Sequence, residues 1–253
     1  MKIPALFILL LAGLVLPAYA DLALTGYSAA GPFSTQERIW IREGRLRRDF
    51  VDRGRAYTHL FDLDKRQVSV VDHLARLIEV HDLQSLQAGT EVGAPANVPK
   101  LNLAPTGETR MLRHWKCEAH TLTASTLTRL GQEETVFHLD GKVWLARGVP
   151  EQAAVKKLAE LGQRKDFFLG VPAAVKATPA QARMLSELVR RLAPLGLPCG
   201  GELDARYEGS GPMARLAQRL PARLSLTIQD FTDAPVEPGL FDLPAGYSVR
   251  RLP

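Results

Sequence analysis

The side chains that most often carry out chemistry are present in this sequence, but without a catalytic spacing. None of the six histidines falls in a His-x-x-x-His or His-Glu-x-x-His pattern. His114 and His120 would share a strand face if one strand ran unbroken between them, and His138 could then complete a metal site. Ordinary polar strand positions are the alternative. Gly-x-Ser-x-Gly, a phosphate-binding glycine loop and a dinucleotide fingerprint are all missing. We therefore expect no catalytic residue, no metal, no cofactor and no enzymatic activity.

The first twenty residues have the pattern of a secretory signal peptide. Lys2 precedes an apolar run from Ala5 to Leu16, and Ala18-Tyr19-Ala20 ends it with small residues where a signal peptidase cuts. The run is shorter than the roughly 20 residues that span a bilayer. We expect residues 1–20 to be removed, a mature chain without a transmembrane segment, and export to the periplasm of a Gram-negative bacterium.

Cys117 and Cys199 are the only cysteines. An even pair in an exported protein predicts a disulfide, which here would close a loop of about 80 residues. A redox or metal pair is an alternative, although no Cys-x-x-Cys is present. Two buried thiols are a third reading.

Arginines and aromatic residues form two further groups. The densest charge cluster contains Arg45, Arg47 and Arg48, and it could contact an acidic partner or lipid head groups. A solvated edge strand kept from aggregating by its charge is the alternative. Four aromatic side chains are candidates for the wall of an apolar ligand cavity, or simply for core filling: Trp40, Phe50, Tyr57 and Trp144.

Composition limits the class of protein. The chain has 253 residues, of which 46% are hydrophobic and 23% charged, so a disordered or fibrous protein is excluded. Its net charge of +5 is mild for an exported protein. We expect no nucleic-acid partner.

Short alternating segments predict that an antiparallel β-meander begins the mature chain. Strands are expected at 36–42, 45–51, 56–63, 67–72 and 74–80, and connections of two to four residues exclude parallel crossovers. Further strands are expected at 108–114, 116–128 and 135–139. Asp140-Gly141 predicts a tight hairpin before a return strand at 142–146.

A helical insert at about 150–196 interrupts the strands. Apolar residues recur at helical spacing between Glu151 and Phe168, and Thr178-Pro179-Ala180-Gln181 is a capping-box start for a second helix. Strands return at 202–207 and 223–231. Because several strands are apolar on both faces, both faces must be covered or must line a cavity. The sequence predicts an α+β fold, mostly antiparallel β, in which residues 21–253 form one domain whose curved sheet wraps around the insert.

Several segments together resemble a known superfamily. They are Trp115-Lys116-Cys117 within Gly107–Glu118, Asp140-Gly141-Lys142-Val143-Trp144-Leu145-Ala146, and the ending Leu240–Tyr247. The chain is similar in these segments to bacterial periplasmic proteins of the LolA/LolB-like superfamily of lipoprotein carriers. The resemblance implies an incomplete antiparallel barrel of about eleven strands, with helices over a hydrophobic cavity that holds acyl chains.

We therefore expect a non-enzymatic periplasmic binding or carrier protein for a hydrophobic ligand, a lipid or an acylated partner. The alternative is an envelope-structural or protein-interaction module with a filled core, which would bind another envelope protein. An unrecognised hydrolase is a third reading and would require a polar triad in a cleft.

Overall fold

The computed structural model describes residues 21–30, 33–83, 85, 98–147, 178–219, 222–232 and 234–252. Its dominant feature is one sheet of twelve strands, open at both edges. The strands are β1 (Leu22–Ala30), β2 (Phe33–Arg42), β3 (Arg45–Asp52), β4 (Arg55–Asp62), β5 (Gln67–Asp72), β6 (Leu77–Asp82), β7 (Lys100–Leu112), β8 (Trp115–Leu130), β9 (Glu133–Ala146), β10 (Leu197–Glu208), β11 (Ala222–Thr232) and β12 (Ser248–Leu252).

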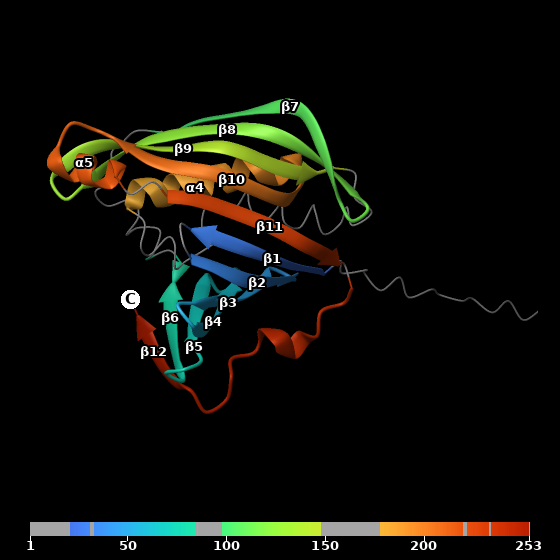
Figure 1. Ribbon diagram of the computed structural model, residues 1–253. Helices are drawn as coiled ribbons and strands as arrows, with labels where there is room; N and C mark the ends of the chain where they lie inside the picture. Colours follow the sequence, from blue (N-terminus) through green and yellow to red (C-terminus); the bar gives the residue numbers. More distant parts are fainter. Residues whose placement is uncertain are drawn as a thin grey trace, which may run out of the picture.

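The strand order shows how two meanders make one sheet. It runs β12-β6-β5-β4-β3-β2-β1-β11-β10-β9-β8-β7, so β1–β6 and β7–β11 each follow the chain and meet where β1 pairs with β11 (Figure 1). At this seam the segment after β11 contacts the residue before β1: the Val236 amide donates to Asp21 Oδ2 at 2.8 Å. All strand pairs are antiparallel except the pair of β12 with β6. The expected antiparallel sheet is thus confirmed, while β12 was not predicted.

Helix α4 (Pro179–Leu192) covers one face of the sheet, which we call the inner face. It begins as predicted, because the Thr178 side chain accepts from the Gln181 amide and the Gln181 side chain accepts from the Thr178 amide. Met184 and Leu188 bury the apolar stripe against β8–β10. Val189 reaches the main core, which includes the inner residues of β1–β5. The sheet therefore curves around α4 (Figure 1), and within the described ranges no helix is long and apolar enough to cross a membrane.

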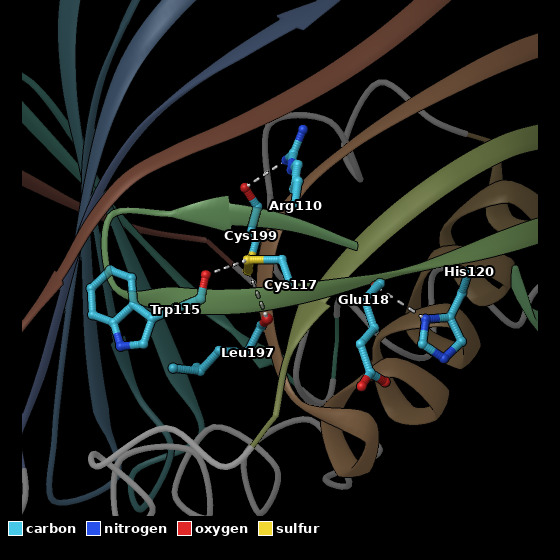
Figure 2. The surroundings of a disulfide bond; sticks show 7 residues. All are labelled: Arg110, Trp115, Cys117, Glu118, His120, Leu197 and Cys199. Atoms are coloured by element: carbon cyan, nitrogen blue, oxygen red, sulfur yellow. Dashed lines mark hydrogen bonds between the residues drawn. A yellow bond between two sulfur atoms is a disulfide. The ribbon is translucent and has the colours of Figure 1, made fainter. Parts of the chain in front are cut away.

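A disulfide joins Cys117 of β8 to Cys199 of β10, with a Cα–Cα distance of 6.3 Å. The two strands are not neighbours, since β9 lies between them and its Ala146 pairs with Cys117 on one side and Leu197 on the other. Cys199 sits at an irregularity in the β9–β10 pairing. In Figure 2 the Arg110 side chain approaches the Cys199 carbonyl, to which its Nη2 donates at 3.1 Å. The predicted disulfide is confirmed, and it links β8 to β10 across the intervening strand β9.

The outer face of β2–β6 is covered by residues 234–247, which we call the C-terminal strap. Tyr247 packs on a core cluster of Leu60, Val71, Ile78 and Val80. Arg42 donates to the Val236 carbonyl and Arg47 to the Leu240 carbonyl, both at 2.6 Å. The strap contains the short 3-10 helix η2 (Pro238–Phe241), and its Phe241 ring lies beneath Arg45. The first meander is therefore covered on its outer side by the end of the chain.

The expected hairpin at Asp140-Gly141 is wrong. Residues 133–146 form one continuous strand, and the turn between β8 and β9 lies at Gly131-Gln132. Gly141 serves a different purpose, because a Cβ at this position would clash with the Glu202 carbonyl of β10. The glycine thus allows close strand approach rather than a turn.

A short helix, α5 (Pro212–Gln218), follows Gly211, and the Glu133 carboxylate accepts from the Met213 amide at its start. The helix expected between Glu151 and Phe168 and the signal peptide at 1–20 lie outside the described residues. One further 3-10 turn, η1 (Ala193–Leu195), ends α4.

Candidate functional site

The inner face of the first meander carries a polar group inside an apolar surround. Ile41, Leu46, Phe61 and Val68 form one cross-strand row, and all four are buried. One step along each strand on the same face is the row Ile39, Arg48, His59 and Val70. Period-two alternation therefore places a cation and an imidazole directly beside the main core.

Arg48 is neutralised by Glu37 from the neighbouring strand. Its Nε donates to Glu37 Oε2 at 2.9 Å and its Nη2 to Oε1 at 2.6 Å, a bidentate geometry. The Ser28 hydroxyl of β1 also donates to Glu37. The two charged side chains are only 15% and 8% exposed, and the Arg48 guanidinium lies 4.7 Å from the Phe50 ring centroid. The pair brings opposite charges into the interior without net charge.

His59 is the unusual member of this group. It is 0% exposed, and neither ring nitrogen has a hydrogen-bond partner among the described residues. Its ring packs edge-on to Phe50 at 4.7 Å and to Phe61 at 6.4 Å between centroids. Burial, together with the charges of Arg48 and His81, lowers the pKa of His59 from its ordinary 6.5 to about 3. The imidazole is therefore neutral at physiological pH.

A buried imidazole without partners is costly, because each unpaired polar atom loses its hydrogen bonds to water. Native interiors pair nearly all such atoms, and exceptions call for an explanation such as a bound group. The neutral ring offers one N–H donor and one bare nitrogen acceptor. Chemically, this arrangement suits binding: it can hydrogen-bond a polar group brought into an aromatic and aliphatic setting.

The structure brings together two of the four predicted cavity-wall residues. Phe50 and Tyr57 stack at 5.6 Å on the inner face beside His59. Trp40 lies on the outer face, where it pairs with Arg47. Trp144 belongs to the second meander and alternates with Val143, which faces α4, so its ring points away from α4 and packs against the main core cluster that includes the disulfide.

The Trp144 ring has its own cationic partner. Arg110 of β7 lies over it at 4.5 Å, and Lys142 approaches the same ring at 5.8 Å. Burial lowers the pKa of Arg110. Because Arg110 also donates to Cys199, this contact belongs to the surroundings of the disulfide rather than to the His59 group (Figure 2).

The predicted interaction patch is divided between two faces. Arg45 and Arg47 point outward to the C-terminal strap, and Arg47 also forms a bidentate pair with Asp49 at 2.9 Å. Arg48 points inward to Glu37. The three arginines thus do not form one surface.

The histidines considered for a metal site also separate. His114 lies in a turn before β8, so the strand does not run unbroken from His114 to His120. His120 is buried, and His138 lies on the outer face, where its Nε2 is 2.9 Å from Glu208. Among the described residues, no three metal-ligating side chains converge.

A groove lies on the outer face of β7–β9. This groove has a volume of about 340 Å³, and it is lined by Lys100, Leu101, Asn102, Thr123, Ala124, Ser125, His138 and Asp140. Two of its polar members have partners, since His138 pairs with Glu208 and Asp140 with Arg206 at 3.1 Å. The groove is open and polar, in contrast to the His59 site.

His59 and Glu37 were not predicted as site residues, although one signal was available. His59 alternates with Tyr57 and Phe61, and Arg48 alternates with Leu46 and Phe50. A polar residue at an apolar position of such a strand marks an exception to the pattern. Glu37 gave no such signal, because its pairing with Arg48 depends on the register of β2 and β3.

Comparisons with known proteins add no family assignment. No protein-family model matches the chain, and no curated protein matches it.

Proposed function

We propose that this protein is a non-enzymatic periplasmic carrier with a LolA-like fold, which binds an apolar or acylated ligand on the inner face of its sheet. The observation that carries the proposal is His59, a completely buried imidazole with both ring nitrogens unpartnered among the described residues. A ligand with a polar group would supply the hydrogen-bond partners that this ring lacks.

The surrounding side chains favour binding over chemistry. Phe50, Tyr57 and Phe61 supply aromatic surface next to His59. Arg48 and Glu37 satisfy each other, so neither is free to act as an acid, a base or a nucleophile activator. The open curved sheet around α4 is consistent with the incomplete barrel that the superfamily resemblance implies.

Binding is tested by titrating the purified chain with a fluorescent fatty acid, after delipidation by organic solvent, and by mass spectrometry of the extract. We expect saturable uptake. Phe50→Ala should weaken it about tenfold or more, since burying an aromatic side chain contributes 1.5–3 kcal/mol. Trp40→Ala, on the outer face, is the matched control and should bind normally. If no lipid is extracted and no saturable uptake occurs, the chain is not a carrier.

A further inference from the structure

The His59 ring has a hydrogen-bonding capacity that no described residue uses. Its protonation state decides which chemical groups it can bind. The ring is neutral, because burial lowers its pKa to about 3. A neutral imidazole both donates and accepts a hydrogen bond but supplies no positive charge. A ligand group that binds the His59 ring must therefore be recognised by hydrogen bonding rather than by charge.

The nearest cation does not change this. Arg48 lies directly opposite His59 across the β3–β4 pair, yet two of its donors are bound by Glu37. An anionic head group placed here could form an ion pair with Arg48 only by competing with the Glu37 carboxylate. It would also lose its hydration in an interior where an unpaired charge costs several kcal/mol.

Other charged groups of the inner face lie farther along the same row. Val70 separates His59 from Glu79 of β6, and Glu79 bonds Arg250 of β12. His81 lies 3.9 Å from the same carboxylate. The acidic and basic side chains on both sides of His59 are thus already paired.

We propose that His59 is a specificity-determining residue that selects amphiphiles with an uncharged hydrogen-bonding head, such as a fatty alcohol or a monoacylglycerol, over fatty-acid anions. This inference rests on the proposed carrier function and deepens it. A hydroxyl can donate to the bare nitrogen or accept from the N–H, and an ester carbonyl can accept. The acyl chain would then contact Phe50, Phe61 and the neighbouring aliphatic row.

The test uses the full mature chain loaded with 1,6-diphenylhexatriene, an uncharged apolar fluorophore, and measures its displacement by monoolein and by oleate at pH 9. We expect monoolein to displace the fluorophore about tenfold better than oleate, the ratio given by one additional hydrogen bond. His59→Phe should abolish this preference. His59→Gln, which retains one donor and one acceptor, should keep most of it.

A spectroscopic measurement separates specificity from structure. The ¹⁵N shifts of the His59 ring should move when monoolein binds and stay unchanged with hexadecane. Equal or tighter displacement by oleate, or an unchanged preference in His59→Phe, would overturn the inference while leaving the carrier function intact. Failure of the fluorophore and of every lipid to bind would overturn both.

Discussion

Tyr247 and His73 are joined although they lie 174 positions apart: the Tyr247 hydroxyl is 3.2 Å from Nδ1 of the His73 ring. The other ring nitrogen is 2.9 Å from the hydroxyl of Thr58, which donates to Asp49 at 2.6 Å. Asp49 in turn holds Arg47, whose guanidinium donates to the Leu240 carbonyl. One chain of hydrogen bonds therefore fixes the C-terminal strap near its middle, at Leu240, and at its end, at Tyr247.

Removing the first link should loosen the strap. Tyr247→Phe keeps the ring on the Leu60 cluster but deletes the hydroxyl, so we expect a loss of about 1 kcal/mol in the free energy of unfolding. Hydrogen exchange of residues 236–247 should accelerate. Tyr27→Phe, at a half-exposed tyrosine, is the control and should change neither quantity. Identical exchange in Tyr247→Phe and the parent would count against the linked chain.

The disulfide should contribute strongly to stability. Closing a loop of about 80 residues restricts the unfolded chain by about 4 kcal/mol on the chain-entropy model. Cys117→Ser/Cys199→Ser should lower the urea midpoint accordingly. Intact mass under denaturing conditions should rise by two hydrogens on reduction, and an unchanged mass would show free thiols.

Removing one partner of the buried Glu37–Arg48 ion pair should lower the free energy of unfolding more than replacing both partners with apolar residues. Glu37→Gln leaves Arg48 charged and unpaired in the interior, and we expect a loss of about 3 kcal/mol in unfolding free energy. Glu37→Leu/Arg48→Met removes both charges and should recover much of that loss. A double mutant as unstable as the single one would indicate that the pair is not buried as described.

His59 should make stability dependent on pH. The folded ring stays neutral down to about pH 3, whereas the unfolded ring takes up a proton near pH 6.5. Below pH 6.5 the unfolded chain therefore binds more protons, and the free energy of unfolding falls by about 1.4 kcal/mol per pH unit. Above pH 6.5 this contribution to the pH dependence vanishes.

The variant His59→Phe isolates this contribution. Urea unfolding of the parent and the variant between pH 7.5 and 5 should give curves that separate as the pH falls, with the variant less sensitive to acid. Parallel curves would mean that the ring titrates in the folded protein, and so would contradict the burial.

Gly141 gives a test of the β9–β10 approach. Gly141→Ala places a methyl group against the Glu202 carbonyl, so the two strands must separate, and we expect a loss of 1–3 kcal/mol. Gly239→Ala meets only the Asp242 side chain at 3.7 Å and serves as the tolerated control. Similar melting temperatures for the two variants would exclude the close approach.

The sequence predicted the elements that local patterns encode. Alternation located the strands from β2 to β6, and the Thr178–Gln181 capping box located the start of α4. Asp140-Gly141 misled because the same dipeptide can serve a turn or a close strand contact, and only the neighbouring β10 decides between them. The parallel pairing of β12 was not encoded locally, since its partner β6 lies about 170 positions earlier in the chain.

The site could be predicted only in part for the same reason. Phe50 and Tyr57 were selected as apolar-cavity residues, and the β3–β4 register pairs them directly on one face. Their relation to Arg48, Glu37 and Ser28 depends on the registers of three strand pairs, which period-two patterns do not fix. Trp40 and Trp144 have the same chemistry as Phe50 but the opposite orientation.

The C-terminal strap also constrains how the protein can be made. During synthesis, β3–β6 can pair long before residues 234–247 exist, and until then Leu60, Val71, Ile78 and Val80 have no cover on their outer side. β1 likewise waits for β11 with one edge unpaired. An apolar sheet with a free edge is prone to aggregation. A growing chain of this protein therefore needs to be kept unfolded, or held by a chaperone, until its final segment has emerged.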